Sequence, residues 1–585
     1  MAKVREKHNG GLAPFWDKPG VLEIVLACVS LLAFVGTLAF DFVYDDREQI
    51  LQNPFITAWK YLPHDFTSDS WAQSAGHQIK YYRPAVVSWM RMNYSLAGTE
   101  PWAWHLSTVL AHVLATVLVF KLAMRLLQNR WQALIAGLIF AVHPVHVESV
   151  AWVCGAADPL LAVFFLGSLL CYLNWRDHRS PAWMAASLVL GLLAMLAKEP
   201  GVALPAVVFA YAWIFAEVPD GAPGADRRLR AAVASAAPFL LVFAAYFVLR
   251  HIALRTASPV AASNATALLT VPGLLLFYLR IAAWPVGLTV FYDRSFVGHA
   301  TFGGVWLPLL VLALLAAVFL LFAARSRQRR VELFSLALAL LTLFPVLWVR
   351  WFPSDDFVHD RYLYLPLAGI AMLFATIIVH LGGRPMPGWV APVRQIVVVC
   401  AVVVVLLGET LWLQRSWKDD FALWSHCYRT APHNQRVLNN LASAMGERGD
   451  YQNAIRLFLE ILQRNPNDER ALGNLGYTFY RMGDLQKAEQ TLGRAVQLDP
   501  SDAHSLLYLG VAHFKLGLLA PAEEELKQAI ALSPETRGAH LALSFVLERQ
   551  GDVEGAIRET ANELSRNPGQ GALEQRLNQL RAAHP

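Results

Sequence analysis

Ionisable side chains stand beside apolar runs at several points of this 585-residue chain, where they could do chemistry at a membrane surface. Asp45 and Asp46 follow directly on the apolar run 21–43. A carboxylate at such a border meets a falling dielectric constant, so its pKa tends to rise, which suits a general base. A solvated acidic flank is the alternative. Two adjacent carboxylates could also hold a divalent cation, but they are too few ligands to predict a metal site.

Three basic side chains lie next to other apolar runs and could bind a phosphate group. Arg361 lies in Asp-Arg-Tyr-Leu-Tyr-Leu-Pro, Lys198 precedes Glu199 between two runs, and Arg83 lies in Tyr-Tyr-Arg-Pro. Arginine binds phosphate oxygens in a bidentate manner and stays charged at any relevant pH. We therefore expect Arg361, Lys198 and Arg83 to bind a phosphate. Alternatively, Lys198 and Glu199 only neutralise each other, and Arg83 only extends toward lipid head groups.

The turn Ala-Val-His-Pro-Val-His-Val-Glu-Ser-Val-Ala-Trp places His143, His146 and Glu148 between two further apolar runs, with Asp158 near the same surface. Ionisable groups at membrane depth are costly and usually functional. The spacing His-x-x-His-x-Glu could indicate zinc, but no third and fourth ligand is evident, so no metal is predicted. We expect these four residues, with Glu199, to line a hydrogen-bonded site. Cations that hold a phosphate leaving group, beside a carboxylate that deprotonates a hydroxyl, suit a reaction with a lipid-linked phosphate donor.

The elements that must position these side chains are apolar helices. Hydrophobic residues make up 56% of the chain and charged residues only 16%, against about 25% in soluble proteins. This composition excludes disorder, a collagen fold and a disulfide-stapled secreted fold. The residues from 431 onward carry a net charge of −3, which leaves +8 for residues 1–430. The sequence therefore predicts a polytopic membrane protein with a mildly acidic soluble tail.

Eleven apolar runs are long enough to cross a bilayer core of about 30 Å. They lie near 21–43, 103–124, 131–147, 150–173, 182–197, 200–216, 232–250, 305–323, 331–349, 363–381 and 395–413. If the stretch 267–291 is re-entrant or interfacial, every basic cluster faces the cytoplasm, from the N-terminus through Arg325–Arg330 to Arg384 and Arg394. We predict a cytoplasmic N-terminus and an external C-terminus. The positive charge then sets topology and does not indicate nucleic-acid binding.

The tail repeats with a period of 34 residues. Four sets of equivalent residues show it: Pro432, Pro466, Pro500, Pro534 and Pro568; Gly449, Gly483, Gly517 and Gly551; Ala454, Ala488, Ala522 and Ala556; Leu441, Leu475, Leu509 and Leu543. This pattern is typical of about four tetratricopeptide repeats, an α-solenoid with a concave face that docks peptides or proteins. We divide the chain into a membrane domain at 1–415 with a first external loop at 44–102, a lead-in at 416–431 and a repeat domain at 432–585.

The motifs, in this order, resemble those of the transmembrane and tetratricopeptide-repeat O-mannosyltransferases: Tyr-Asp-Asp, Tyr-Arg-Pro, His-Pro-Val-His-x-Glu-x-Val-Ala-Trp, Ala-Lys-Glu and Arg-Tyr-Leu-Tyr-Leu-Pro, followed by the repeats. The resemblance implies an all-α GT-C type membrane glycosyltransferase that uses a polyprenyl-phosphate sugar with inversion at the anomeric carbon. It implies the catalytic base at Asp45 or Asp46 and phosphate contacts at Arg361 and Lys198. His143, His146 and Glu148 would line the site.

Two departures qualify what the resemblance implies. Only four clear repeats are present, where animal members usually carry more, and the Ala-rich chain has a bacterial style. A bacterial chain would use undecaprenyl phosphate instead of dolichyl phosphate, its sugar need not be mannose, and its repeats would lie in the periplasm. In a eukaryote the repeats would lie in the lumen of the endoplasmic reticulum.

Three functions are compatible with these features. The first is transfer of a sugar to Ser/Thr hydroxyls of protein acceptors on the outer face, with the repeats binding the acceptor. The second is a transferase that acts on a glycan or lipid acceptor. The third is a non-enzymatic membrane scaffold whose repeats are a docking module, although ionisable clusters at membrane depth argue against it.

Overall fold

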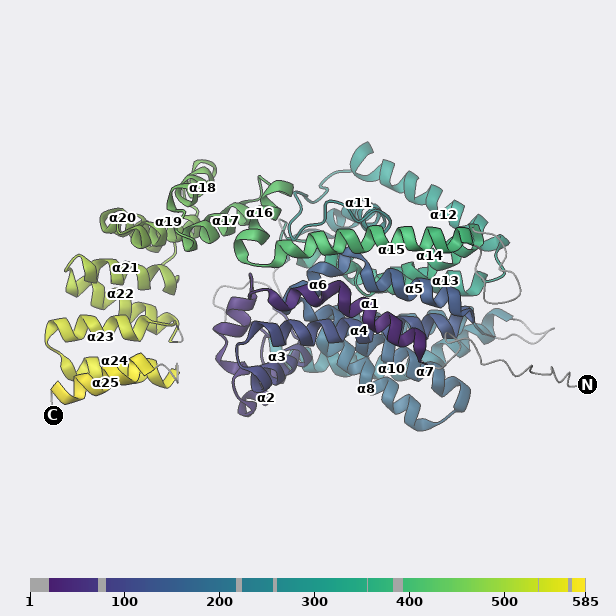
Figure 1. The fold of residues 1–585 in the computed structure, drawn as a ribbon, viewed down its shortest axis with the longest axis horizontal. Helices are drawn as coiled ribbons and strands as arrows, with labels where there is room; N and C mark the ends of the chain where they lie inside the picture. The colour runs from purple at the N-terminus through teal and green to yellow at the C-terminus, as the bar shows by residue number, and fades with distance from the viewer. Residues whose placement is uncertain are drawn as a thin grey trace, which may run out of the picture.

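The computed structural model describes residues 20–71, 80–216, 224–255, 260–354, 356–381, 393–534, 536–566 and 571–583. The N-terminal basic cluster, Arg384 and Pro568 lie outside these residues. Two parts follow one another along the long axis of the molecule: a bundle of long helices near the N-terminus and a stack of short helices near the C-terminus (Figure 1). All regular elements of the described residues are helical, which confirms the predicted all-α class.

Eleven helices of the bundle coincide with the eleven predicted runs. They are α1 (Val21–Phe34, continued by a 3₁₀ turn to Ala39), α4 (Pro101–Leu127), α5 (Arg130–Val142), α7 (Ala157–His178), α8 (Pro181–Ala197), α9 (Leu204–Ile214), α10 (Gly224–Leu254), α12 (Leu307–Arg325), α13 (Arg329–Leu347), α14 (Pro366–Leu381) and α15 (Val393–Leu413). Among the described residues, eight helices are long and apolar enough to cross a membrane singly, and α5 with α6 (Val147–Ala151) makes a bent ninth. The helices in three of the predicted runs, α8, α9 and α14, are shorter than such a span. Proline at the first position starts α4 and α8, where its fixed φ suits a helix and its missing N–H costs nothing.

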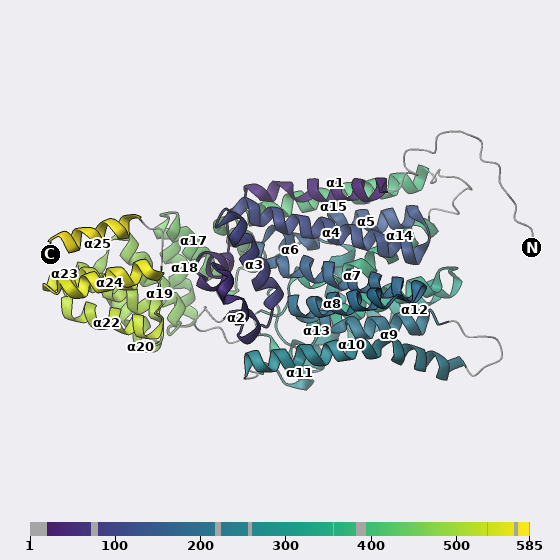
Figure 2. The ribbon, with the colours of Figure 1, turned by 90° about the horizontal axis from the view of Figure 1, so that it is seen from below.

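One of those eight long helices, α11 (Asn264–Ala283), begins and ends at the same end of the bundle. Before its first residue, the amide of Ala261 donates to the carbonyl of Arg350 at 2.9 Å. Near its last residue, the carbonyl of Ala282 accepts a bond from His143 Nε2 at 3.1 Å. Both partners lie at the end of the bundle that faces the repeats, and α11 lies on that side in Figure 2. This geometry favours the re-entrant or interfacial interpretation of 267–291.

The opposite end of the bundle carries the basic turns. Arg125 at the end of α4 forms an ion pair with Asp177 at the end of α7. Gln328, in the basic segment before α13, donates to the carbonyl of Leu127 at 3.2 Å and bonds Gln132. The clusters around Arg125, Arg179 and Arg325 therefore share one end, as the predicted cytoplasmic face requires.

The C-terminal part is a solenoid of paired helices. The pairs are α17 (Gln435–Glu447) and α18 (Tyr451–Arg464), α19 (Glu469–Met482) and α20 (Leu485–Leu498), α21 (Ala503–Lys515) and α22 (Leu519–Leu532), and α23 (Ala539–Gln550) and α24 (Val553–Arg566), followed by α25 (Gly571–Ala583). The equivalent glycines 449, 483, 517 and 551 adopt φ between 82° and 90°, the left-handed turn that favours glycine. A Cβ at Gly476 would come within 2.6 Å of Leu492, so this glycine lets the two helices of its pair touch. Four repeats are confirmed.

The predicted lead-in 416–431 is an ordered connection. It holds the end of a 3₁₀ turn (Gln414–Trp417) and helix α16 (Asp420–Thr430), which packs on α17. One hydrophobic core runs without a break from Leu22 in α1 through Trp424 in α16 to Leu475 in α19. Arg47 in the first loop also pairs with Asp420 at 2.7 Å and with Glu447 at 2.9 Å. The repeats are therefore joined to the bundle by packing as well as by the chain.

The first external loop contains the short helices α2 (Leu62–Thr67) and α3 (Pro84–Ala97). Arg91 of α3 forms a fully buried ion pair with Asp65 of α2. Its guanidinium also donates to the carbonyls of Ala58, at 3.0 Å, and Phe55, at 2.9 Å. One side chain thus satisfies acceptors from three points of the loop and holds its path.

The substitution Arg91→Met tests this contact. It leaves the carboxylate of Asp65 buried without its cation, so we expect a loss of about 3–5 kcal/mol in folding free energy and faster proteolysis of the loop. Thermal unfolding and limited proteolysis of the detergent-solubilised chain measure both. The control Arg230→Met removes the exposed pair with Asp226 and should change neither. Equal behaviour of the two variants would contradict the assigned role.

Candidate functional site

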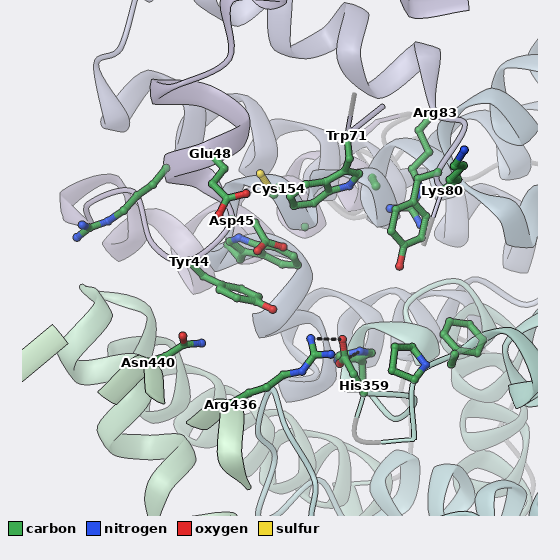
Figure 3. A pocket seen from close by; sticks show the side chains of 18 of the residues that line it. Tyr44, Asp45, Glu48, Trp71, Lys80, Arg83, Cys154, His359, Arg436 and Asn440 are labelled. Carbon is green, nitrogen blue, oxygen red and sulfur yellow. Dashed lines mark hydrogen bonds and ion pairs between the residues drawn. The ribbon is translucent and has the colours of Figure 1, made fainter. Parts of the chain in front are cut away.

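A cavity of about 1660 Å³ lies between the end of the bundle and the first three repeats. Its walls come from the first loop, the start of α7, the turn between α8 and α9, the end of α10, the segment between α13 and α14, and the helices α17, α19 and α21. Figure 3 shows Tyr44 and Asp45 facing Arg436 and Asn440 of the repeats across this space. The cavity collects most of the candidate residues.

Asp45 and Asp46 have different surroundings although they are neighbours in sequence. Tyr44 adopts a positive φ of 55°, with its amide donating to Asp420 at 2.8 Å, and this turn sends the two following side chains apart. Asp45 is half-buried and lines the cavity. Asp46 is fully buried outside the lining, where it accepts bonds from the amides of Cys154, at 2.8 Å, and Val43, at 3.2 Å.

Burial raises the pKa of both carboxyls above the usual range of Asp. For Asp45, Glu48 adds to the rise and Arg361 opposes it. For Asp46 the pKa rises to about 7, although its two amide bonds favour the ionised form. Asp45 is therefore the carboxylate that can meet a substrate in the cavity, and Asp46 is the carboxylate that ties the loop to the start of α7.

Arg361 is held at the cavity wall by Glu148. Glu148 is 3% exposed, accepts the backbone amide of Arg361 at 2.9 Å and pairs with its guanidinium. The same carboxylate lies 3.5 Å from Nδ1 of His359, whose Nε2 lies 3.0 Å from Asp356. Asp356 in turn pairs with Arg436 of the first repeat at 3.5 Å. A chain of polar contacts thus joins the repeats to Arg361.

Two further cations reach the cavity on ion pairs of their own. Lys198 Nζ lies 2.6 Å from Asp158, and burial lowers the pKa of Lys198 to about 8 while Asp158 opposes the fall. Arg83 lies 2.7 Å from Glu199, which helps to raise the pKa of Arg83 further against the effect of burial. All four side chains line the cavity. The cations therefore stay charged at neutral pH and present fixed positive groups to it.

His143 and His146 lie beneath the cavity and do not line it. His143 is buried against the end of α11 through its bond to Ala282. The ring of His146 is buried against Phe140, at 4.4 Å, and Tyr364, at 4.3 Å between centroids. Glu148 also lies outside the lining, but it touches Arg361 directly. The histidines thus shape the turn that presents Glu148.

The cavity also contains residues that the sequence motifs do not mark. Arg250 at the end of α10 lines the cavity, and its Nη1 is buried without a hydrogen-bond partner among the described residues. Arg436 reaches the cavity from a repeat. Neither carries a sequence signal, because Arg250 follows an ordinary apolar run and Arg436 resembles any polar residue of a solenoid. Asp356 and His359 stood in the segment before Arg361 and could have been found there.

In the described part of the chain, no group of three or more His, Cys, Asp or Glu side chains is arranged as metal ligands. Asp45 and Asp46 cannot form a joint carboxylate pair toward one ion in this geometry, because only Asp45 faces the cavity. The arrangement places Asp45 and other carboxylates beside at least three cations. It can bind an anionic group and remove a proton from a nearby hydroxyl.

Comparison with known families agrees with the motifs. Residues 82–220 match the family described as dolichyl-phosphate-mannose-protein mannosyltransferase. Residues 447–509 and 507–571 match tetratricopeptide repeats. The first match includes Arg83, Asp158, Lys198 and Glu199, whereas Asp45 and Arg361 lie outside it.

Curated relatives of the chain are named protein O-mannosyl-transferases. The chain is 35% identical over 199 residues to protein O-mannosyl-transferase TMTC2 of Mus musculus, 33% of this chain and 24% of that protein. It is 25% identical to protein O-mannosyl-transferase F38B6.6 of Caenorhabditis elegans over 74% of this chain and 62% of that protein. It is 27% identical to protein O-mannosyl-transferase TMTC1 of Homo sapiens over 75% of this chain and 54% of that protein. The chain spans less than two thirds of these relatives, and the predicted resemblance is confirmed.

The raised pKa of Asp46 predicts a pH-dependent stability. Unfolded Asp46 loses its proton near pH 4 and folded Asp46 near pH 7, so between these values the folded state binds more protons. The contribution of Asp46 to stability therefore falls as the pH rises from about 4 to about 7. As the pH rises from about 4 to about 7, the melting temperature of the native chain should fall relative to that of Asp46→Asn.

The same melting series contains its control. The variant Asp41→Asn, at an exposed position five residues before Asp46, should keep the native pH profile. The side-chain amide in Asp46→Asn accepts one hydrogen bond fewer from the backbone, which lowers the melting temperature by the same amount at every pH. The slope of melting temperature against pH is therefore the quantity to compare. Parallel curves for Asp46→Asn and the native chain would contradict the assignment.

Proposed function

Since residues 82–220 match the mannosyltransferase family and repeats follow, we propose that the chain is a membrane glycosyltransferase. It moves a sugar from a polyprenyl-phosphate donor to Ser/Thr hydroxyls of protein acceptors on the outer face of the membrane. One observation carries the proposal: Asp45, Arg361, Lys198 and Arg83 line one cavity at the end of the bundle opposite the basic turns. A scaffold has no need of that convergence.

In the proposed reaction Asp45 is the general base. It takes the proton of the acceptor hydroxyl as the hydroxyl oxygen forms a bond to the anomeric carbon. The bond between that carbon and the phosphate oxygen breaks on the opposite face, so the configuration inverts and the lipid phosphate leaves with the electron pair. The raised pKa of Asp45 makes it a stronger base than an exposed carboxylate.

The cations act on the leaving group. Arg361, Lys198 and Arg83 are positioned by Glu148, Asp158 and Glu199 before any substrate binds. Preorganised positive charge stabilises the phosphate as its negative charge develops, without reorganisation during the step. Arg361 also stacks on Trp152, with its guanidinium carbon 5.3 Å from the ring centroid, which limits its freedom further. The leaving phosphate does not need to be protonated by a side chain, because these cations stabilise its negative charge.

The repeats stand beside the cavity and bind the protein acceptor in this proposal. With the basic turns in the cytoplasm, the cavity and the repeats face the periplasm of a bacterium or the lumen of the endoplasmic reticulum. The carrier is undecaprenyl phosphate in the first case and dolichyl phosphate in the second. Mass spectrometry of outer-face proteins with and without the gene tests the acceptor class. A glycan lost only from lipids or polysaccharides would overturn the protein acceptor.

The variant Asp45→Asn tests the base. The amide cannot accept the hydroxyl proton, so we expect sugar transfer in proteoliposomes to fall by about 10²–10⁴-fold, with donor binding retained. Asp41→Asn is the matched control: its carboxylate lies four residues earlier in the chain, is exposed and does not line the cavity. Full activity of Asp45→Asn would refute its role as the base, and absence of transfer by the native chain would favour a scaffold.

The variant Arg361→Lys tests the phosphate contact. Lysine keeps the positive charge beside Glu148 but loses the bidentate geometry, so the fold should persist while the KM for the donor rises about tenfold or more. Transfer rates measured against polyprenyl-phosphate mannose and against an acceptor peptide separate the two KM values. A rise in the KM for the acceptor alone would show that Arg361 contacts the acceptor and not the donor.

A further inference from the structure

The cavity continues along the inner face of the repeats. Besides Asp45 and Arg361, its lining includes residues of α17, α19 and α21, the first helices of three successive repeats. These residues recur at the repeat period: Arg436, Arg470 and His504 form one row, and Asn440, Asn474 and Tyr508 form a second. The proposed reaction centre and the concave face of the solenoid are therefore one continuous space.

The repeat portion of this space is lined by charged side chains of both signs and by amides, hydroxyls and two tyrosines. Asn474 Nδ2 donates to Asn439 Oδ1 at 3.1 Å, and Asn439 Nδ2 donates to Asn440 Oδ1 at 3.4 Å. Among the described residues these bonds leave Asn440 Nδ2 and Asn474 Oδ1 without a protein partner. Each of the two amides thus offers one hydrogen-bonding group to the groove, a donor in the first repeat and an acceptor in the second.

Beyond the amides, Tyr477 and Tyr508 make an aromatic surface, with their ring centroids 4.4 Å apart. The face of a tyrosine ring packs against side chains of many kinds, while its hydroxyl group can form a hydrogen bond at the same time. Large aliphatic residues are missing from the described lining of α17, α19 and α21, so this face lacks the apolar core on which folded proteins dock.

Resting on the proposed function, we propose that the acceptor is an extended, unfolded polypeptide segment that lies along α17, α19 and α21 and delivers one Ser or Thr to Asp45. An extended chain exposes backbone N–H and C=O groups that need partners, and the free ends of Asn440 and Asn474 supply a donor and an acceptor. A folded domain has satisfied these groups internally and gains nothing from the amides.

The entrance to the reaction centre supports an extended segment. Arg47 with Glu447 and Arg436 with Asp356 bridge the bundle and the first repeat at the cavity wall. Asp45 lies inside this wall and is only half-exposed. A serine on the surface of a folded domain could reach Asp45 only if the whole domain passed between these ion pairs. An extended segment is narrow enough to pass between them.

The geometry sets a length requirement. Neighbouring inner helices lie about 8–10 Å apart, so three repeats span about 20 Å. An extended chain covers about 3.3 Å per residue, so about six residues occupy the groove and a few more reach Asp45. Acceptor peptides of about ten residues should therefore bind better than a threonine dipeptide, which cannot touch the repeats.

The test uses the full chain in proteoliposomes and one fluorescent Thr-containing peptide of about ten residues, linear or closed into a ring by a disulfide. Fluorescence anisotropy measures binding without catalysis, and transfer from polyprenyl-phosphate mannose measures turnover. We expect the linear form to bind at least tenfold more tightly. In Asn440→Ala/Asn474→Ala its Kd and KM should rise about tenfold with kcat unchanged, and transfer to the dipeptide should not change.

Asn453→Ala is the matched control, because Asn453 is an exposed asparagine on the outer helix α18 and does not line the cavity. It should behave as the native chain. Equal binding of ring and linear peptide, or an unchanged Kd in the double variant, would overturn the extended acceptor while transfer to the dipeptide upholds the enzyme. Tight, amide-dependent binding without transfer to any acceptor would overturn the enzyme and leave the groove as a peptide-binding site.

Discussion

The site depends on keeping charged groups paired where water is scarce. A buried charge is tolerated only with a partner in good geometry, and removal of one partner leaves the other at a large cost. Glu148, 3% exposed, is the centre of this constraint. It joins Arg361 and His359, which lie more than 200 residues later in the chain, to the turn after α5. The pairs of Asp158 with Lys198 and Glu199 with Arg83 do the same for α7, α8 and the first loop. Each pair leaves a cation at the cavity wall.

The same kind of contact places the repeats. Arg436 of α17 reaches Asp356, which connects through His359 to Glu148. With the shared hydrophobic core through α16, this makes the solenoid part of the cavity wall. An array of repeats joined only by a flexible segment would bind partners anywhere around the membrane domain. Here its concave face opens onto the proposed reaction centre, which limits the paths by which an acceptor can reach Asp45.

Asp45 and Asp46 show how two identical side chains acquire different chemistry. Both follow the same apolar helix, and both are raised in pKa by burial. The left-handed turn at Tyr44 directs Asp45 into the cavity and Asp46 onto the amides of Val43 and Cys154. One carboxylate keeps its oxygens available to a substrate, and the other uses them to hold the backbone. The same distinction separates Glu148, which positions Arg361, from His143 and His146, which pack beneath.

The amino-acid sequence by itself determined the helices, their order and the repeat period, because apolar length and recurring Gly, Ala and Pro act locally. It also marked Asp45, Arg83, Lys198 and Arg361, since ionisable residues beside apolar runs are rare. It could not separate Asp45 from Asp46, place His143 and His146 in the core, or find Arg250 and Arg436. Those distinctions depend on a backbone turn at Tyr44 and on contacts such as Arg436 with Asp356, 80 residues apart. Only the tertiary structure decides them, because burial and pairing are properties of the packed helices and not of the local chain.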